Sequence, residues 1–362
     1  MKHLHLHFLL LLSCISLLRC AVVPAADDGG RRRESRALLK WKASLSGGDT
    51  YLSSWTTPAN SSSPCSWDFI TCDSAGDVTG LNITGTFASQ DLDAGLRGTL
   101  AALDFSAFPR LQTLQLSQNN LYGAIPEGIG NLTGLVSLNI SFDFLTGPIP
   151  RSIGQLEHLS VLALQFLLLQ GRIPDEIGNL TSLQVLELTH NALTGSVIPP
   201  AAASGSRLTW LGLSQNSLSG GIPLEIGNMS ELRGIDLGYN INLEGPLPNT
   251  LSRLGKLRYL LLSNNRFGGD LDSSQLGSNN SNLLQIDVES NDFTRVSARS
   301  ICAGGALEDF KGNSNSPWQV LSSGTTVFLE TSANCLASSR SRSFRRSTSA
   351  KTSSVGRFHL SW

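Results

Sequence analysis

The sequence predicts an α/β repeat solenoid whose short strands stack into one concave parallel β-sheet. Three observations predict this fold. Leucine supplies 61 of the 362 residues, which excludes a disordered chain because such chains lack the apolar side chains of a core. One leucine position recurs every 24 to 26 residues, and the same pattern, L-x-x-L-x-L-x-x-N-x-L-x-G-x-I-P, follows it; such a period is typical of leucine-rich repeats. The recurring leucines are Leu111, Leu135, Leu159, Leu183, Leu208, Leu232, Leu257 and Leu283.

Each conserved letter of this internal repeat has a physical role. The segment L-x-x-L-x-L points alternate side chains inward along a short strand. The asparagine at the ninth position is expected to bond backbone groups that would otherwise be buried unpaired. The glycine permits a tight turn, and Ile-Pro directs an extended return along the convex side. The asparagines are Asn119, Asn191, Asn216, Asn240, Asn265 and Asn291.

Eight units follow the pattern, and a ninth, irregular one is predicted at residues 78–99. Two units depart from the pattern because Asp143 and Leu167 occupy the ninth position. A leucine side chain forms no hydrogen bonds. We therefore expect local disorder or unsatisfied carbonyl groups around Leu167.

Residues 1–26 are predicted to be a secretory signal peptide. Lys2 gives the basic start, and an apolar run at residues 8–18 precedes small residues that suit cleavage. The run is too short to cross about 30 Å of hydrocarbon as a helix. No later segment reaches 18 apolar residues, so we expect no membrane span in this chain.

The cysteines outside the signal peptide are expected to meet an oxidising compartment. Cys65 and Cys72 are a candidate disulfide. A metal site is disfavoured because CxxC spacing and nearby histidines are absent. Whether Cys302 pairs with Cys335 stays open.

The repeats resemble the plant-specific extracellular leucine-rich-repeat family, through L-x-G-x-I-P and I-G-N-L-T linkers such as residues 129–133. Residues 34–45 resemble the helix of that family's N-terminal cap, and L-S-S-W at 52–55 with C-S-W…C at 65–72 matches its other signatures. The resemblance covers residues 34–293. It implies a helical, disulfide-bearing cap and the ectodomain of a receptor-like kinase or receptor-like protein.

The expected organisation has four parts. They are a signal peptide at 1–26, the cap at 27–77, about nine repeats at 78–293, and a basic, serine-rich, partly disordered tail at 294–362. The resemblance leads us to expect a chain truncated before any membrane span or kinase. An uncapped last repeat is then expected to expose Leu283, Ile286 and Val288.

The concave face is the predicted ligand-binding surface, formed by positions 3, 5, 7 and 8 of each unit. Eight strands about 4.8 Å apart would hold an extended peptide of about ten residues. Trp and Tyr with acidic neighbours are typical of recognition hot spots. The alternative is ordinary surface aromatics, or phenylalanines that fill a distorted core in the irregular units. The predicted ligand-binding residues are Trp210, Tyr239, Tyr259, Phe166, Phe142, Glu187, His190 and Asp236.

Seven N-x-S/T sequons predict N-glycosylation, although several coincide with the I-G-N position of the repeat itself. A glycan on Asn139 would partly block the concave face at the second unit. The predicted glycosylation sites are Asn60, Asn82, Asn131, Asn139, Asn179, Asn228 and Asn279.

Enzymatic motifs for hydrolases, metalloproteases, kinases and dinucleotide binding are absent, so we expect no catalysis, cofactor or metal. A net charge of −1 disfavours nucleic acid as a partner. The resemblance implies a secreted or cell-surface protein of the apoplast, in receptor-like signalling or defence. Its expected partners are an extracellular peptide or protein and a leucine-rich-repeat co-receptor kinase. The alternatives are an inhibitor of secreted cell-wall-degrading enzymes, similar to the polygalacturonase inhibitors, and a truncated non-functional fragment.

Overall fold

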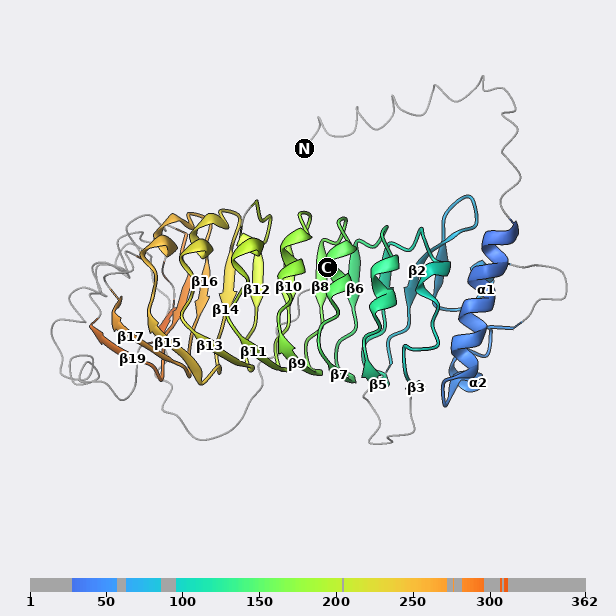
Figure 1. Ribbon diagram of the computed structural model, residues 1–362, viewed down its shortest axis with the longest axis horizontal. Helices are drawn as coiled ribbons and strands as arrows, with labels where there is room; N and C mark the ends of the chain where they lie inside the picture. The colour runs from blue at the N-terminus through green and yellow to red at the C-terminus, as the bar shows by residue number, and fades with distance from the viewer. Residues whose placement is uncertain are drawn as a thin grey trace, which may run out of the picture.

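The structure is an elongated stack of repeats closed at one end by a helical cap (Figure 1). The cap contains α1 (Asp28–Ala43), α2 (Gly48–Tyr51) and the 3-10 turn η1 (Pro64–Ser66). In this computed structural model no helix among the described residues is long and apolar enough to cross a membrane. The described residues are 28–56, 63–85, 96–203, 205–271, 276, 282–295, 307 and 309–311, so the predicted signal peptide, Cys302 and Cys335 lie outside them.

An 11-stranded sheet forms the concave side, and its strands are parallel except for the antiparallel pair β1–β2. Register is constant along the repeats: Leu114, Leu138 and Leu162 are direct partners on neighbouring strands, and all three are fully buried. The strands are β1 (Ile70–Cys72), β2 (Val78–Asn82), β4 (Thr113–Gln115), β6 (Ser137–Asn139), β8 (Val161–Ala163), β10 (Val185–Glu187), β12 (Trp210–Gly212), β14 (Gly234–Asp236), β16 (Tyr259–Leu261), β18 (Gln285–Asp287) and β20 (Asp309–Lys311).

A second, nine-stranded lateral sheet follows the turn of each repeat. Gly147 and Gly195 have φ angles of 80° and 84°, which is the left-handed conformation that the predicted tight turn requires. The strands are β3 (Arg97–Gly98), β5 (Asn120–Ala124), β7 (Phe144–Gly147), β9 (Leu168–Arg172), β11 (Ala192–Gly195), β13 (Ser217–Gly220), β15 (Asn242–Pro246), β17 (Arg266–Asp270) and β19 (Asp292–Arg295).

Short 3-10 turns complete the convex side. They need more room than strands about 4.8 Å apart, so the stack curves with the 11-stranded sheet inside. The turns are η2 (Phe105–Ala107), η3 (Glu127–Asn131), η4 (Arg151–Gln155), η5 (Asp175–Asn179), η6 (Pro200–Ala203), η7 (Leu224–Asn228) and η8 (Asn249–Arg253).

The ninth-position asparagines form the predicted hydrogen-bond ladder. The Nδ2 atom of Asn216 donates to the carbonyl of Leu213 in its own repeat and to that of Leu188 in the preceding one, at 3.1 and 3.0 Å. Its Oδ1 atom accepts the amide of Leu193 at 3.0 Å. Each asparagine therefore links consecutive repeats through backbone groups that are buried from water.

The prediction of local disorder at Leu167 is wrong. Strands β8 and β9 on either side of it each pair with both neighbouring strands, and the Leu167 side chain is buried. The Leu167 amide donates to the His190 carbonyl at 3.2 Å, so the backbone is held without a ladder side chain. In a regular repeat the Ile140 carbonyl would accept hydrogen bonds from ladder asparagines at positions 143 and 167. Asp143 and Leu167 occupy these positions, so neither supplies an amide donor.

The cap covers one end of the repeat stack, and an additional strand extends the concave sheet at the other. At the cap, Trp41 and Trp55 are buried, and the indole nitrogen of Trp41 donates to the Thr99 carbonyl of the first repeat at 2.9 Å. At the other end β20 pairs with β18 beyond residue 293. The prediction of exposed apolar residues in the last repeat is wrong: Leu283, Ile286 and Val288 are at most 2% exposed, because they pack inward between the two sheets.

Candidate ligand-binding face

Trp210 is the first residue of β12, a strand near the middle of the concave sheet, and three strands supply its surroundings. It stands in register with Gly234 on β14, which in turn is opposite Tyr259 on β16. The predicted pair Trp210 and Tyr259 therefore lies in one row, separated by a strand that carries no side chain at that position. Both rings are half-buried.

The indole ring of Trp210 is fixed by a hydrogen bond and by two glycines. Its Nε1 atom donates to Glu187 Oε2 on β10 at 2.8 Å. A Cβ added at Gly234 would overlap the indole ring, and one added at Gly212 would overlap the Glu187 carboxylate. The ring thus extends over β14 and the carboxylate over β12, and each occupies space that any residue other than glycine would fill.

Asp236 on β14 provides a second carboxylate near the first. Its Oδ2 atom accepts the Ser214 hydroxyl of β12 at 2.8 Å, and its Oδ1 atom accepts the Gly238 amide at 3.1 Å. Burial raises the pKa of Asp236 to about 6, and the nearby negative charge of Glu187 also raises it. Asp236 therefore titrates near neutral pH rather than near its usual pKa.

Phe142, Phe166 and His190 form a stack along one rim of the concave face. The Phe142 and Phe166 ring centroids are 4.5 Å apart with an interplanar angle of 11°, and Phe166 and His190 are 4.8 Å apart at 23°. All three residues have positive φ angles, because position 8 is where the chain turns out of the strand. The phenylalanines are half-buried, so the alternative that Phe166 fills the core is wrong.

The structure separates Tyr239 from the other predicted tyrosine. It occupies position 8 of its repeat with φ of 58°, on the same rim as the ring stack, and is 55% exposed. Tyr259 occupies position 3, at the opposite side of the strand row. Gly212, Gly234 and Ser214 also belong to this site, although the leucine pattern does not single them out; two glycines at strand positions that usually carry side chains are the signal in the sequence.

The sequons fall on different surfaces. Asn131, Asn179 and Asn228 are exposed at the ends of convex 3-10 turns, and Asn82 is exposed at the end of β2. Asn139 is half-buried on the concave face, where its Oδ1 atom accepts the Ser141 hydroxyl at 2.6 Å. Asn60 and Asn279 lie outside the described residues.

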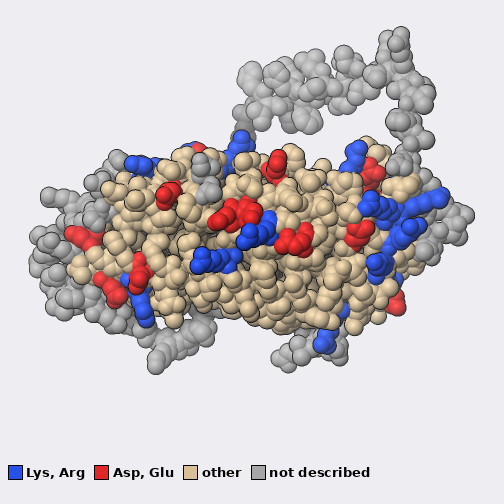
Figure 2. All heavy atoms as spheres, viewed as in Figure 1, with Lys and Arg blue, Asp and Glu red and all other residues tan. Residues whose placement is uncertain are grey.

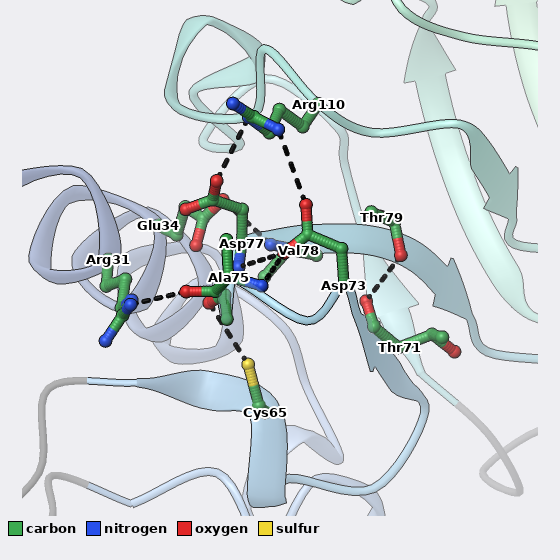
Figure 3. A network of polar contacts seen from close by, with 11 residues as sticks. Arg31, Glu34, Cys65, Thr71, Asp73, Ala75, Asp77, Val78, Thr79 and Arg110 are labelled. Atoms are coloured by element: carbon green, nitrogen blue, oxygen red, sulfur yellow. Dashed lines mark hydrogen bonds and ion pairs between the residues drawn. The ribbon is translucent and has the colours of Figure 1, made fainter. Parts of the chain in front are cut away.

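A polar network joins the cap to the first repeat (Figure 3). Buried Glu34 accepts the Val78 amide at 3.1 Å through Oε1, while its Oε2 atom is buried without a partner among the described residues. Arg110 pairs with Asp77 at 3.0 Å and with Asp73 at 3.5 Å. Burial raises the pKa of Glu34 to about 7, so this carboxyl is suited to the protonated form.

The surface charge is unevenly spread around this cap. On the face in Figure 2, basic side chains gather at the cap end, over α1. The exposed residues Arg32, Arg36 and Lys40 lie four positions apart on that helix, so they share one side of it. They belong to no predicted site.

The disulfide prediction is confirmed, since Cys65 and Cys72 are bonded. Among the described residues no cluster of three or more His, Cys, Asp or Glu side chains is arranged to hold a metal ion. The concave face therefore offers an aromatic surface, two carboxylates and hydroxyl groups for binding.

Comparisons with known proteins agree with this architecture. The leucine rich repeat N-terminal domain family matches residues 32–73, and the leucine rich repeat family matches residues 110–132, 207–229 and 256–279. A probable leucine-rich repeat receptor-like protein kinase of Arabidopsis thaliana is 35% identical over 127 residues, which are 34% of this chain and 10% of that relative. The chain thus matches only about a tenth of the length of this kinase.

Two solved structures illustrate the likeness of fold. The ectodomain of the Arabidopsis thaliana membrane receptor kinase GASSHO1/SCHENGEN3, in complex with CASPARIAN STRIP INTEGRITY FACTOR 2, is 29% identical, with a TM-score of 0.65 over 78% of this chain and 35% of that one. A plant ice-binding protein is 27% identical, with a TM-score of 0.64 over 78% of this chain and 86% of that one. Repeat pattern, cap and relatives agree: the chain carries a leucine rich repeat N-terminal domain followed by leucine rich repeats, and it is similar to plant leucine-rich-repeat receptor-like kinases.

Proposed function

We propose that this protein binds an extracellular peptide or protein ligand on its concave face, as a receptor-type ectodomain without catalysis of its own. The observation that carries the proposal is the hydrogen bond between Trp210 and Glu187, whose side chains lie over Gly234 and Gly212. A residue that only stabilises the fold does not need an aromatic ring that is held in place on the exposed face of a sheet. A fixed ring loses little conformational entropy when a ligand packs on it, which favours binding.

The solved relative supports the same use of the fold. The GASSHO1/SCHENGEN3 ectodomain was crystallised with a bound factor. Two further observations agree with a cell-surface or apoplastic location: the Cys65–Cys72 disulfide suits an oxidising compartment, and four sequon asparagines are exposed. A leucine-rich-repeat co-receptor kinase is the proposed second partner.

The test is selection from a displayed library of random decapeptides by the secreted protein. Wild-type protein is expected to enrich one family of sequences, and Trp210→Ala is expected to weaken their binding at least about tenfold, as for a central hot-spot residue. Tyr122→Ala is the matched control, because Tyr122 is an aromatic residue 48% exposed on the lateral sheet. Unchanged affinity in Trp210→Ala would contradict a concave site.

The second candidate, inhibition of a secreted cell-wall-degrading enzyme, rests on the same open face and on the shared cap. A pull-down with polygalacturonase, followed by an activity assay, distinguishes it from peptide recognition. Inhibition of the enzyme that is lost in Trp210→Ala would reverse the order of the two functions. Binding without inhibition would leave the receptor-type proposal in first place.

A further inference from the structure

At the four strand positions predicted to line the concave face, the charged residues of the repeats are all of one sign. Positions 3, 5, 7 and 8 from Thr113 to Ser290 contain the acids Glu187, Asp236, Asp287 and Glu289 and no lysine or arginine. Asp287 is neutralised by Lys311 of β20 at 3.3 Å. Glu187 and Asp236 form no ion pair with another described residue; amide, hydroxyl and indole groups are their hydrogen-bond donors.

These two carboxylates converge although they come from strands that are not neighbours. Strand β12 lies between β10 and β14, with Gly212 in register between Glu187 and Asp236. The Glu187 carboxylate lies over Gly212, and Asp236 accepts the hydroxyl of Ser214 from the same strand. Both negative groups therefore lean toward β12, beside the fixed ring of Trp210.

We propose that the concave centre binds an arginine side chain of an extended peptide, which stacks on Trp210 and pairs with Glu187 and Asp236. The proposal rests on the proposed function and names the chemistry that its ligand carries. The site supplies both interactions that a guanidinium forms well: stacking on an indole face and charge-assisted hydrogen bonds to carboxylates.

Arginine fits this arrangement better than lysine does. Its planar guanidinium has five donors in a fixed fork, so one group can address two carboxylates from different directions while lying flat on the ring. A lysine ammonium is a compact charge and would favour one carboxylate. The bound cation also relieves the repulsion between two negative groups that the free protein leaves without a positive partner.

The test begins with the decapeptides that the wild-type protein enriches from the random library. They are expected to share arginine at one position. One such peptide is then synthesised with arginine or with citrulline, which keeps the shape and removes the charge. For wild-type protein citrulline is expected to raise Kd about tenfold or more, the usual effect of losing a charged hydrogen bond.

The variants assign that effect to the two carboxylates. In Glu187→Gln/Asp236→Asn the ratio of Kd between the citrulline and arginine peptides is expected to fall below about twofold. A double-mutant cycle gives this result when the two carboxylates contact the arginine directly. Glu244→Gln removes one exposed carboxylate from the lateral strand β15 and is expected to keep the full difference. Melting curves confirm that each variant is folded.

The outcomes separate this inference from the function on which it rests. Enriched peptides without a shared basic residue, which still require Trp210, would overturn the arginine site and leave peptide binding intact. A citrulline effect that persists in the double variant would place the arginine elsewhere and also overturn the inference. Enrichment of no peptide at all would reject peptide binding on the concave face and, with it, this inference.

Discussion

Asp143 has a carboxyl oxygen where asparagine has an amide nitrogen, and its repeat therefore lacks the hydrogen bonds that the amide donates. It occupies the ladder position, is 5% exposed, and accepts the Leu121 amide at 3.0 Å through Oδ1. Its Oδ2 atom, where asparagine would have its donor, is buried without a hydrogen-bond partner among the described residues. Burial raises the pKa of Asp143 to about 8, because an ionised carboxylate there would lose its water and gain little in return.

Asp143→Asn is therefore expected to stabilise the protein. The amide would donate to the carbonyls that Asn216 and its counterparts satisfy in other repeats, and recovering an unsatisfied buried group contributes about 1–3 kcal/mol. The free energy of unfolding, measured in urea at pH 7, tests this. Asp143→Ala is the control that removes the buried carboxyl without adding a donor; equal gains in both variants would show that loss of the carboxyl, and not the new hydrogen bonds, accounts for the change.

The cap is the element whose stability depends most on a covalent link. Cys65 of η1 and Cys72 of β1 close a short loop, and the rings of Trp55 and Trp67 stack beside it with centroids 5.7 Å apart. A terminal repeat has no neighbour to bury its core. Opening this loop therefore loosens the cover over the first repeat as well as the cap.

Cys65→Ala/Cys72→Ala is expected to lower the free energy of unfolding by about 2 kcal/mol, somewhat less than for a 15-residue loop because the closed loop is shorter. Urea unfolding followed by tryptophan fluorescence measures the change. Wild-type protein in reducing buffer is the matched comparison and is expected to show the same shift. An unchanged midpoint in both would mean that packing of the cap tryptophans suffices without the disulfide.

The concave strands show how far sequence carries the prediction of a site. Periodicity placed Glu187 and Trp210 on the sheet face, because strand positions alternate between core and surface. It did not predict their hydrogen bond, which joins residues 23 apart and depends on the orientation of two side chains. Gly212 and Gly234 become meaningful only once the register sets them beneath those side chains.

At the scale of the whole molecule, the fold was readable from the leucine pattern since every repeat contacts mainly its neighbours. Two features were not readable. Strand β20 lies in sequence that lacks the repeat pattern, and it joins the sheet through backbone bonds to β18. The repeat that contains Leu167 stays regular because the adjacent strands hold its backbone on both sides. The residue type at position 167 alone does not predict this.

Three buried carboxyls make the stability of the whole protein depend on pH. Burial raises the pKa of Glu34 to about 7, of Asp143 to about 8 and of Asp236 to about 6. An unfolded chain has carboxyl pKa values near 4, so the folded state holds more protons between pH 4 and 8. Stability is then full below the unfolded pKa and is lost as pH rises through the folded values.

We therefore expect the free energy of unfolding to fall between pH 5 and pH 8 by roughly 4–8 kcal/mol, if each of the three groups contributes one to two pKa units of about 1.4 kcal/mol. Urea unfolding at constant ionic strength across this range measures it. In Glu34→Gln/Asp143→Asn two of the three groups no longer titrate, so most of the slope is expected to disappear. Glu244→Gln, an exposed site on the lateral sheet, is expected to keep the wild-type slope. A wild-type protein that gains stability toward pH 8 would show that these carboxyls are ionised in the fold and would contradict the prediction.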